Sequence, residues 1–162
     1  PGGAGGTAMQ TIDPDVLAWI QQIDQTSIYT TSVCTGAWIL GAAGLLEGKG
    51  AATHWYRANE MLTKFGAEYT GKRWTRDGKY WTSAGVTAGL DMSLALVNHL
   101  FGKEYTQAVM LDLEYDPQPP IKGGVPKKST PIIAQLMQDM YDFFLINFVD
   151  CPLGTPGACL FN

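Results

Sequence analysis

The feature that most constrains the fold is a strand-like run that meets a helix-like run at a tight turn. Residues 27–33 (SIYTTSV) are short, apolar and β-branched, which predicts a buried strand. Residues 37–46 (AWILGAAGLL) are apolar almost all round, which predicts a buried helix. Only Cys34, Thr35 and Gly36 lie between the two runs. A buried strand that passes at once into a buried helix is typical of an α/β fold with a parallel sheet.

The rest of the chain continues this alternation of strands and helices. Residues 1–7 (PGGAGGT) predict a glycine-rich loop, and Asp13-Pro14 predicts the start of a helix. The further expected elements are a strand over 51–55, a helix over 58–65, a hairpin over 72–83 with Asp77-Gly78 at its turn, a helix from an N-cap at Thr87 to Gly102, a helix over 104–115, a linker over 116–126, a last helix from 129–131 to about 149 and an irregular tail from 151. This order predicts an α/β three-layer sandwich with a mostly parallel sheet.

Charge and hydropathy exclude several kinds of partner. The 162 residues carry a net charge of −4, and no run of Lys or Arg forms a basic stripe, which argues against nucleic acid. The most apolar run, residues 143–149 (FFLINFV), is far shorter than the roughly 20 residues of a membrane-spanning helix. No metal-ligand spacing or cofactor motif is present, so we expect no metal and no cofactor.

Cys34 is the candidate reactive residue. At a strand-to-helix turn its side chain is expected above the sheet, next to the positive end of a helix, which favours the thiolate. The backbone N–H groups of Thr35 and Gly36 are then donors for a developing negative charge. The alternative is that Cys34 is a buried structural cysteine, because cysteine is among the most buried residue types.

Two further cysteines lie in the tail. Cys151 and Cys159 are separated by Pro and Gly residues, and they form either a disulfide or two free thiols. A disulfide would indicate an exported protein. Otherwise the absence of a signal peptide predicts a cytoplasmic one.

Three segments resemble the ThiJ/PfpI superfamily, which is glutamine amidotransferase-like. Residues 31–55 (TSVCTGAWILGAAGLLEGKGAATHW) resemble its nucleophile segment, and are most similar to isonitrile hydratases and to the sensor domains of AraC-type regulators. Pro1-Gly2-Gly3 resembles the family's PGG loop, and residues 77–91 resemble its hairpin and following helix. The resemblance covers residues 1–120.

The resemblance implies a flavodoxin-like sandwich that forms a homodimer, with Cys34 as its nucleophile. The domain would comprise residues 1–120, and residues 121–162 would add a linker, a terminal helix and a tail packed on it. The implied pocket is built by Gly2, Gly3, Cys34, Thr35 and the end of the 51–55 strand, and the Gly3 N–H would lie opposite the cysteine. His54 and Trp55 would orient substrate or wall the pocket, against the alternatives of a structural histidine and a core aromatic.

The same resemblance excludes two activities and predicts a missing partner. PfpI-type peptidases place a His after the cysteine, where this chain has Thr35. Class I amidotransferases use a His and a Glu near the chain end, and no such pair occurs here. The family's general acid/base is a carboxylate on a strand before the PGG loop, and this chain starts at Pro1. We therefore expect the N-terminal strands to be lacking, because the chain is a fragment, because a processed N-terminal piece stays bound, or because another subunit fills the gap.

The expected function is hydration of an isonitrile, R–NC, to an N-substituted formamide through a Cys34 thiolate. One alternative is a ligand-sensing domain of a transcriptional regulator. Another is a glyoxalase or a redox sensor of the same superfamily. All three involve a small-molecule ligand or a reactive thiol, with no nucleic acid or membrane partner in this chain.

Overall fold

The computed structural model describes residues 1–151 of the chain. These residues form seven α-helices and five short strands. Their bounds are α1 Ala4–Gln10, α2 Pro14–Thr26, β1 Thr30–Val33, α3 Gly36–Ala42, β2 Gly50–Ala51, α4 Ala58–Lys64, β3 Glu68–Tyr69, β4 Trp74–Asp77, β5 Tyr80–Ser83, α5 Val86–Phe101, α6 Lys103–Asp112, the 3₁₀ turn η1 Pro126–Lys128 and α7 Pro131–Asp150.

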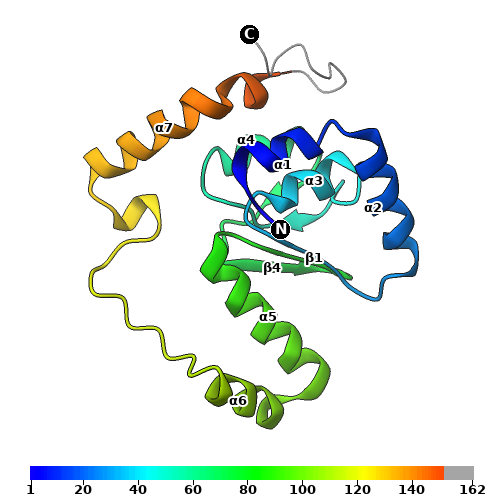
Figure 1. Ribbon diagram of the computed structural model, residues 1–162, viewed down its shortest axis with the longest axis vertical. Coiled ribbons are helices and arrows are strands. Elements are labelled where there is room, and N and C mark those ends of the chain that lie inside the picture. The colour runs from blue at the N-terminus through cyan, green and yellow to red at the C-terminus, as the bar shows by residue number, and fades with distance from the viewer. Residues whose placement is uncertain (152–162) are drawn as a thin grey trace.

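The strands form a three-stranded sheet in the order β1-β5-β4 and a two-stranded sheet of β2 and β3. β1 pairs with β5 in parallel and β2 pairs with β3 in parallel, whereas the β4–β5 hairpin is antiparallel. In Figure 1 the larger sheet lies between α3 on one face and α5 on the other, and both helices contact β1. The expected α/β layering with mostly parallel pairing is confirmed. Within residues 1–151, β1 has a strand partner at only one of its two edges.

Side-chain hydrogen bonds join the two sheets, and they explain why the strand expected over residues 51–55 is shorter. β2 ends at Ala51. After it, the Ala52 N–H donates to Thr82 Oγ1 over 2.8 Å, and Thr53 Oγ1 donates to the Cys34 carbonyl over 2.9 Å. These residues therefore bond to side chains and turns rather than to a neighbouring strand.

The core lies around α3, as the apolar run predicted. Residues 36–41 of this helix are all buried. Trp38 is fully buried and stacks on Phe148 of α7, with ring centroids 5.8 Å apart. Leu145, Phe148 and Val149 belong to the same buried cluster, so the C-terminal half of α7 packs on the domain. Figure 1 shows the segment after α6 running back along the molecule to reach α7. The boundary at residue 120 stays a prediction.

Several further expectations that rest on local sequence alone are confirmed. Asp13 caps α2 by accepting from the backbone N–H groups of Asp15 and Val16, and Gly102 ends α5, as expected. The hairpin is confirmed, with Asp77 opposite Tyr80 in its register.

Besides the shortened strand over 51–55, three expectations were wrong. The strand expected over 27–33 begins only at Thr30. Residues 1–7 are not all loop, because α1 begins at Ala4. The N-cap of α5 is Gly85, because the Thr87 hydroxyl instead accepts a hydrogen bond from Arg73.

The tail from 152, including Cys159, lies outside the described residues, so the Cys151–Cys159 pairing stays a prediction. In residues 1–151, no helix is both long and apolar enough to span a bilayer.

Candidate functional site

Cys34 lies at the turn between β1 and α3 in an uncommon backbone conformation. Its φ is 60°, in the left-handed region that few residues other than glycine adopt. Two hydrogen bonds hold this turn: the Cys34 N–H donates to the Ser83 carbonyl over 3.1 Å, and Thr53 Oγ1 donates to the Cys34 carbonyl. Such conformations persist where the surroundings over-determine them, and they cluster at functional sites. The turn therefore presents one thiol from a rigid position.

The N-terminal segment crosses directly over this turn. A Cβ atom added to Gly2 would lie 2.5 Å from the Cβ of Cys34 and 3.1 Å from its Sγ. A Cβ atom added to Gly36 would lie 2.6 Å from the Pro1 carbonyl oxygen. The contacts of 2.5 Å and 2.6 Å are shorter than real Cβ atoms show, so this crossing needs glycine on both sides.

The Thr35 hydroxyl fixes the crossing in place. Thr35 is 1% exposed, and its Oγ1 accepts the backbone N–H groups of Gly3 over 3.0 Å and Ala4 over 3.1 Å. Thr7 Oγ1 lies 2.8 Å from this oxygen and 2.7 Å from the Ala4 carbonyl. Because a carbonyl only accepts, Thr7 gives its single proton to Ala4 and Thr35 donates to Thr7. The Thr35 hydroxyl is then fully used within the protein, and the Gly3 N–H is bonded to it rather than turned toward Cys34.

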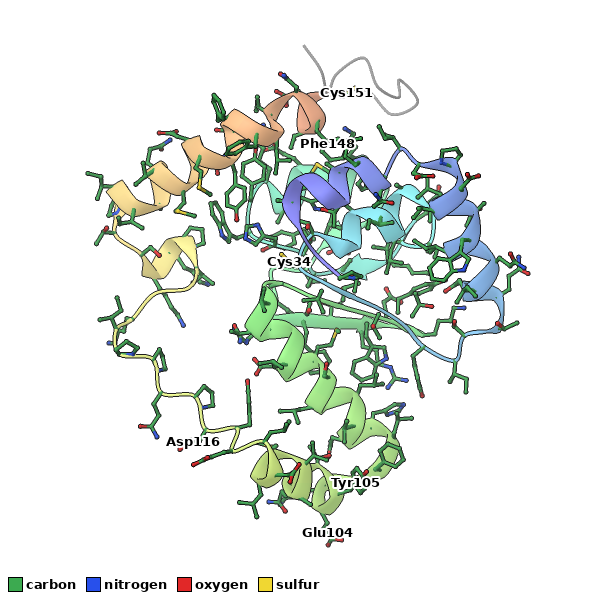
Figure 2. The ribbon with its side chains drawn as sticks, viewed as in Figure 1. Cys34, Glu104, Tyr105, Asp116, Phe148 and Cys151 are labelled. Atoms are coloured by element: carbon green, nitrogen blue, oxygen red, sulfur yellow. The ribbon has the colours of Figure 1, made fainter. Side chains whose placement is uncertain are left out.

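A cavity of about 300 Å³ opens beside the sulfur. Figure 2 places Cys34 near the centre of the molecule, above the first turn of α5, and its side chain is half-buried. The side chains around the cavity are mostly apolar. Its lining consists of Gly2, Gly3, Ala4, Val33, Cys34, Thr35, His54, Val86 and Tyr141. Cys34 is thus accessible from a space large enough for a small molecule.

Aromatic rings form one wall of the cavity. His54 lies against Tyr141, with ring centroids 5.2 Å apart, and Trp55 packs against both rings. Burial lowers the pKa of His54, so its ring is neutral at pH 7. Its Nδ1 accepts the Tyr56 N–H over 3.4 Å, which puts the ring proton on Nε2. This wall therefore presents uncharged groups to a ligand.

The structure brings together most of the residues that the sequence singled out. Gly2, Gly3, Cys34, Thr35 and His54 line the cavity, whereas Gly36 lies beneath Pro1 and Trp55 stands behind the wall.

Sequence reasoning missed Tyr141. Its spacing of four residues from Leu145 and seven from Phe148 puts it on the buried face of α7, which was the available signal. His99 lies elsewhere, bonded through Nε2 to the Tyr29 hydroxyl over 2.9 Å. Among residues 1–151, no three His, Cys, Asp or Glu side chains are grouped closely enough to hold a metal ion.

Substitution of Gly2 by Ala tests the crossing. We expect Gly2→Ala to lower the free energy of unfolding by about 1–3 kcal/mol, because the new methyl group overpacks against Cys34. Displacement of the segment also uncovers the sulfur, so alkylation of Cys34 by iodoacetamide should be faster. Gly5→Ala is the matched control, since a Cβ there meets nothing within 4 Å and α1 continues through it. The control should gain up to about 1 kcal/mol of stability. Equal behaviour of the two variants would contradict the close approach.

The comparisons with known proteins agree with this geometry. Residues 1–99 match the DJ-1/PfpI family. The chain is 46% identical over 127 residues to isonitrile hydratase from Pseudomonas putida, which covers 78% of this chain and 54% of that protein. It is 30% identical over 106 residues to the HTH-type transcriptional regulator CdhR from Pseudomonas aeruginosa, which covers 62% of this chain and 30% of the regulator.

A solved structure shows the same architecture. The crystal structure of a ThiJ/PfpI family protein from Pseudomonas syringae aligns with a TM-score of 0.84 at 38% identity, over 92% of this chain and 60% of that one. By the coverages given above, the chain spans about half the length of isonitrile hydratase and less than a third of the length of the regulator. The fold is the flavodoxin-like α/β fold of these neighbours, and the chain belongs to the DJ-1/PfpI family.

Proposed function

We propose that this chain carries the nucleophile of an isonitrile hydratase, which adds water to R–N≡C and releases an N-substituted formamide. The observation that carries the proposal is the half-buried Cys34 thiol, held at a strand-to-helix turn beside a cavity of about 300 Å³. The 46% identity to an isonitrile hydratase supports the choice of reaction. The mostly apolar lining suits an apolar substituent R, and the reacting carbon would meet the sulfur.

The reaction balances as two additions and one elimination. The Cys34 thiolate forms a bond to the terminal carbon of the isonitrile, and that carbon takes a proton to give the thioformimidate Cys34–S–CH=N–R. Water then adds across the C=N bond, its oxygen to carbon and its proton to nitrogen. Collapse of this adduct breaks the C–S bond, returns the thiolate, releases the hydroxyl proton, which balances the proton taken up first, and leaves R–NH–CHO. Covalent catalysis thereby divides one difficult addition into easier steps.

The other functional assignments remain proposals beside this one. A carboxylate, which is not among the residues that line the cavity, would act as general acid/base, and the protein would act as a homodimer in the cytoplasm. The Thr35 hydroxyl is not assigned to the chemistry, because its bonds to Gly3, Ala4 and Thr7 occupy it. Its proposed role is to hold the glycine segment over the cysteine.

A sensing function is the second candidate, because the chain is also 30% identical to part of a transcriptional regulator. In a sensor the same cavity would bind a small ligand without converting it. Chemistry on glyoxals is the remaining alternative from the same superfamily. The three differ in what leaves the cavity: a formamide, an unchanged ligand or a hydroxy acid.

Product analysis in ¹⁸O-labelled water separates the candidates. The full-length protein is incubated with cyclohexyl isocyanide, and the products are identified by mass spectrometry. We expect N-cyclohexylformamide with the label in its carbonyl oxygen. Saturable binding of the isonitrile without formamide would favour the sensor, and lactate formed from methylglyoxal in a parallel reaction would favour glyoxal chemistry. In either case, the absence of N-cyclohexylformamide from the isonitrile reaction would refute the hydratase proposal.

A further inference from the structure

Helix α7 delivers one side chain to the cavity from the far end of the chain. Tyr141 lines the cavity together with Cys34, more than a hundred residues earlier in the sequence. Three neighbouring aromatic rings pack against its ring. The ring centroids lie 5.2 Å from His54, 5.7 Å from Trp55 and 5.1 Å from Tyr56. Packing of this kind restricts the ring and therefore the position of its hydroxyl group.

Most buried or half-buried tyrosine hydroxyls of residues 1–151 have a hydrogen-bond partner, whereas those of Tyr69 and Tyr141 have none, and of these two only Tyr141 lines the cavity. Among residues 1–151, the Tyr56 hydroxyl donates to Asp142, the Tyr80 hydroxyl to Asp24, and the Tyr29 hydroxyl pairs with His99. The Tyr141 hydroxyl has no hydrogen-bond partner within this described part of the chain, although its side chain is half-buried beside the cavity. Tyrosines placed in this way usually bond to something. A ligand in the cavity is the natural acceptor.

The electrostatic surroundings keep this phenol in its donor form. Burial raises the pKa of Tyr141, and a negative charge on Cys34 raises it further. The hydroxyl thus keeps its proton in the proposed reaction, in which the nearby sulfur acts as a thiolate. One wall of the cavity supplies a hydrogen-bond donor, and another supplies the nucleophile.

We propose that the Tyr141 hydroxyl donates a hydrogen bond to the polar atom of the group that reacts at Cys34. The inference rests on the proposed function, in which that atom is the nitrogen of the thioformimidate and then the oxygen of the formamide. A hydrogen bond to the nitrogen draws electron density from the C=N carbon and favours addition of water. Tyr141 is in this sense a catalytic residue, with the neutral His54 ring beside it as part of the wall.

Replacement of Tyr141 by Phe tests the donor without removing the ring. In full-length protein, Tyr141→Phe should lower kcat for cyclohexyl isocyanide by about 10- to 100-fold, the effect of losing a hydrogen bond to a developing charge. In a Cys34→Ala background, the same change should weaken binding of N-cyclohexylformamide, measured by calorimetry, by about tenfold. The melting temperature should change little, because the ring contacts with His54, Trp55 and Tyr56 remain. Tyr29→Phe is the control, since its hydroxyl pairs with His99 and Tyr29 does not line the cavity.

The outcomes separate this inference from the proposed function. If kcat and formamide affinity are the same in Tyr141→Phe and in Tyr29→Phe, the donor role is overturned even though hydration stands. If the parent protein makes no formamide but binds it in a Tyr141-dependent way, hydration is refuted and the donor role is kept. If the parent neither makes nor binds the formamide, both are overturned. A lower melting temperature with unchanged kcat would reduce Tyr141 to a packing residue.

Discussion

Replacement of Cys34 by Ala is expected to lower isonitrile turnover by about 10⁴-fold or more while leaving the protein folded. The loss is large because the sulfur is the atom that bonds to the substrate carbon, and removal of a covalent nucleophile costs about this much elsewhere. The fold should survive, because the backbone bonds of the turn, from the Cys34 N–H to Ser83 and from Thr53 to the Cys34 carbonyl, do not involve the thiol. The measurements are kcat and the urea-unfolding midpoint of the same preparation.

A second variant and a mass measurement test whether the loss of turnover is specific to the sulfur. Cys34→Ser keeps the shape of the side chain but offers an alcohol, which is a far weaker nucleophile, so it should be nearly as inactive as Cys34→Ala. Brief incubation with the isonitrile should add the mass of one substrate to the peptide that contains Cys34, and not to the Cys34→Ala protein. Turnover within tenfold of the parent in Cys34→Ala would show that Cys34 is not the nucleophile of the hydration.

The site was predictable where its geometry follows from neighbouring residues. A β-branched run, a cysteine, a threonine, a glycine and an apolar helix specify the turn, because each piece has a strong local preference. The hairpin followed from Asp77-Gly78 for the same reason, and Gly78 has a φ of 60° at the turn. The resemblance then added the glycine segment and His54, which local preference alone does not connect to Cys34.

The parts that sequence reasoning missed depend on contacts between distant segments. Helix α1 begins within a glycine-rich run, because the Thr35 hydroxyl, about thirty residues away, accepts the N–H groups of Gly3 and Ala4. Glycine has a low helix propensity, so the local sequence argued against this helix. Tyr141 belongs to a helix whose docking depends on Phe148 meeting Trp38 across the core. Such pairings are not encoded in any one window of the sequence.

The hydroxyl of Thr35 is also the subject of the second large prediction. Thr35→Val replaces one buried oxygen by a methyl group of similar size, so it leaves no cavity and isolates the effect of the hydrogen bonds. The N–H groups of Gly3 and Ala4 and the buried Thr7 hydroxyl would each lose the Thr35 oxygen as a partner, and each such hydrogen bond contributes about 0.5–1.5 kcal/mol. We expect the free energy of unfolding to fall by about 3 kcal/mol, measured by urea denaturation.

The same substitution should separate the glycine segment from the cysteine. Without the bonds to Gly3 and Ala4, the segment over Cys34 loses its anchor, and turnover should fall by about 100-fold, as expected for misplacement of a site by about 1 Å. Thr35→Ser keeps the oxygen and loses only a methyl group, so it should retain most of the activity and cost about 1 kcal/mol of stability. The contrast between Val and Ser is the decisive comparison, because it sets shape against hydrogen bonding at one position. If Thr35→Val matched the parent in stability and turnover while Thr35→Ser did not, packing of the methyl group, and not the hydroxyl, would hold the N-terminal segment over the sulfur.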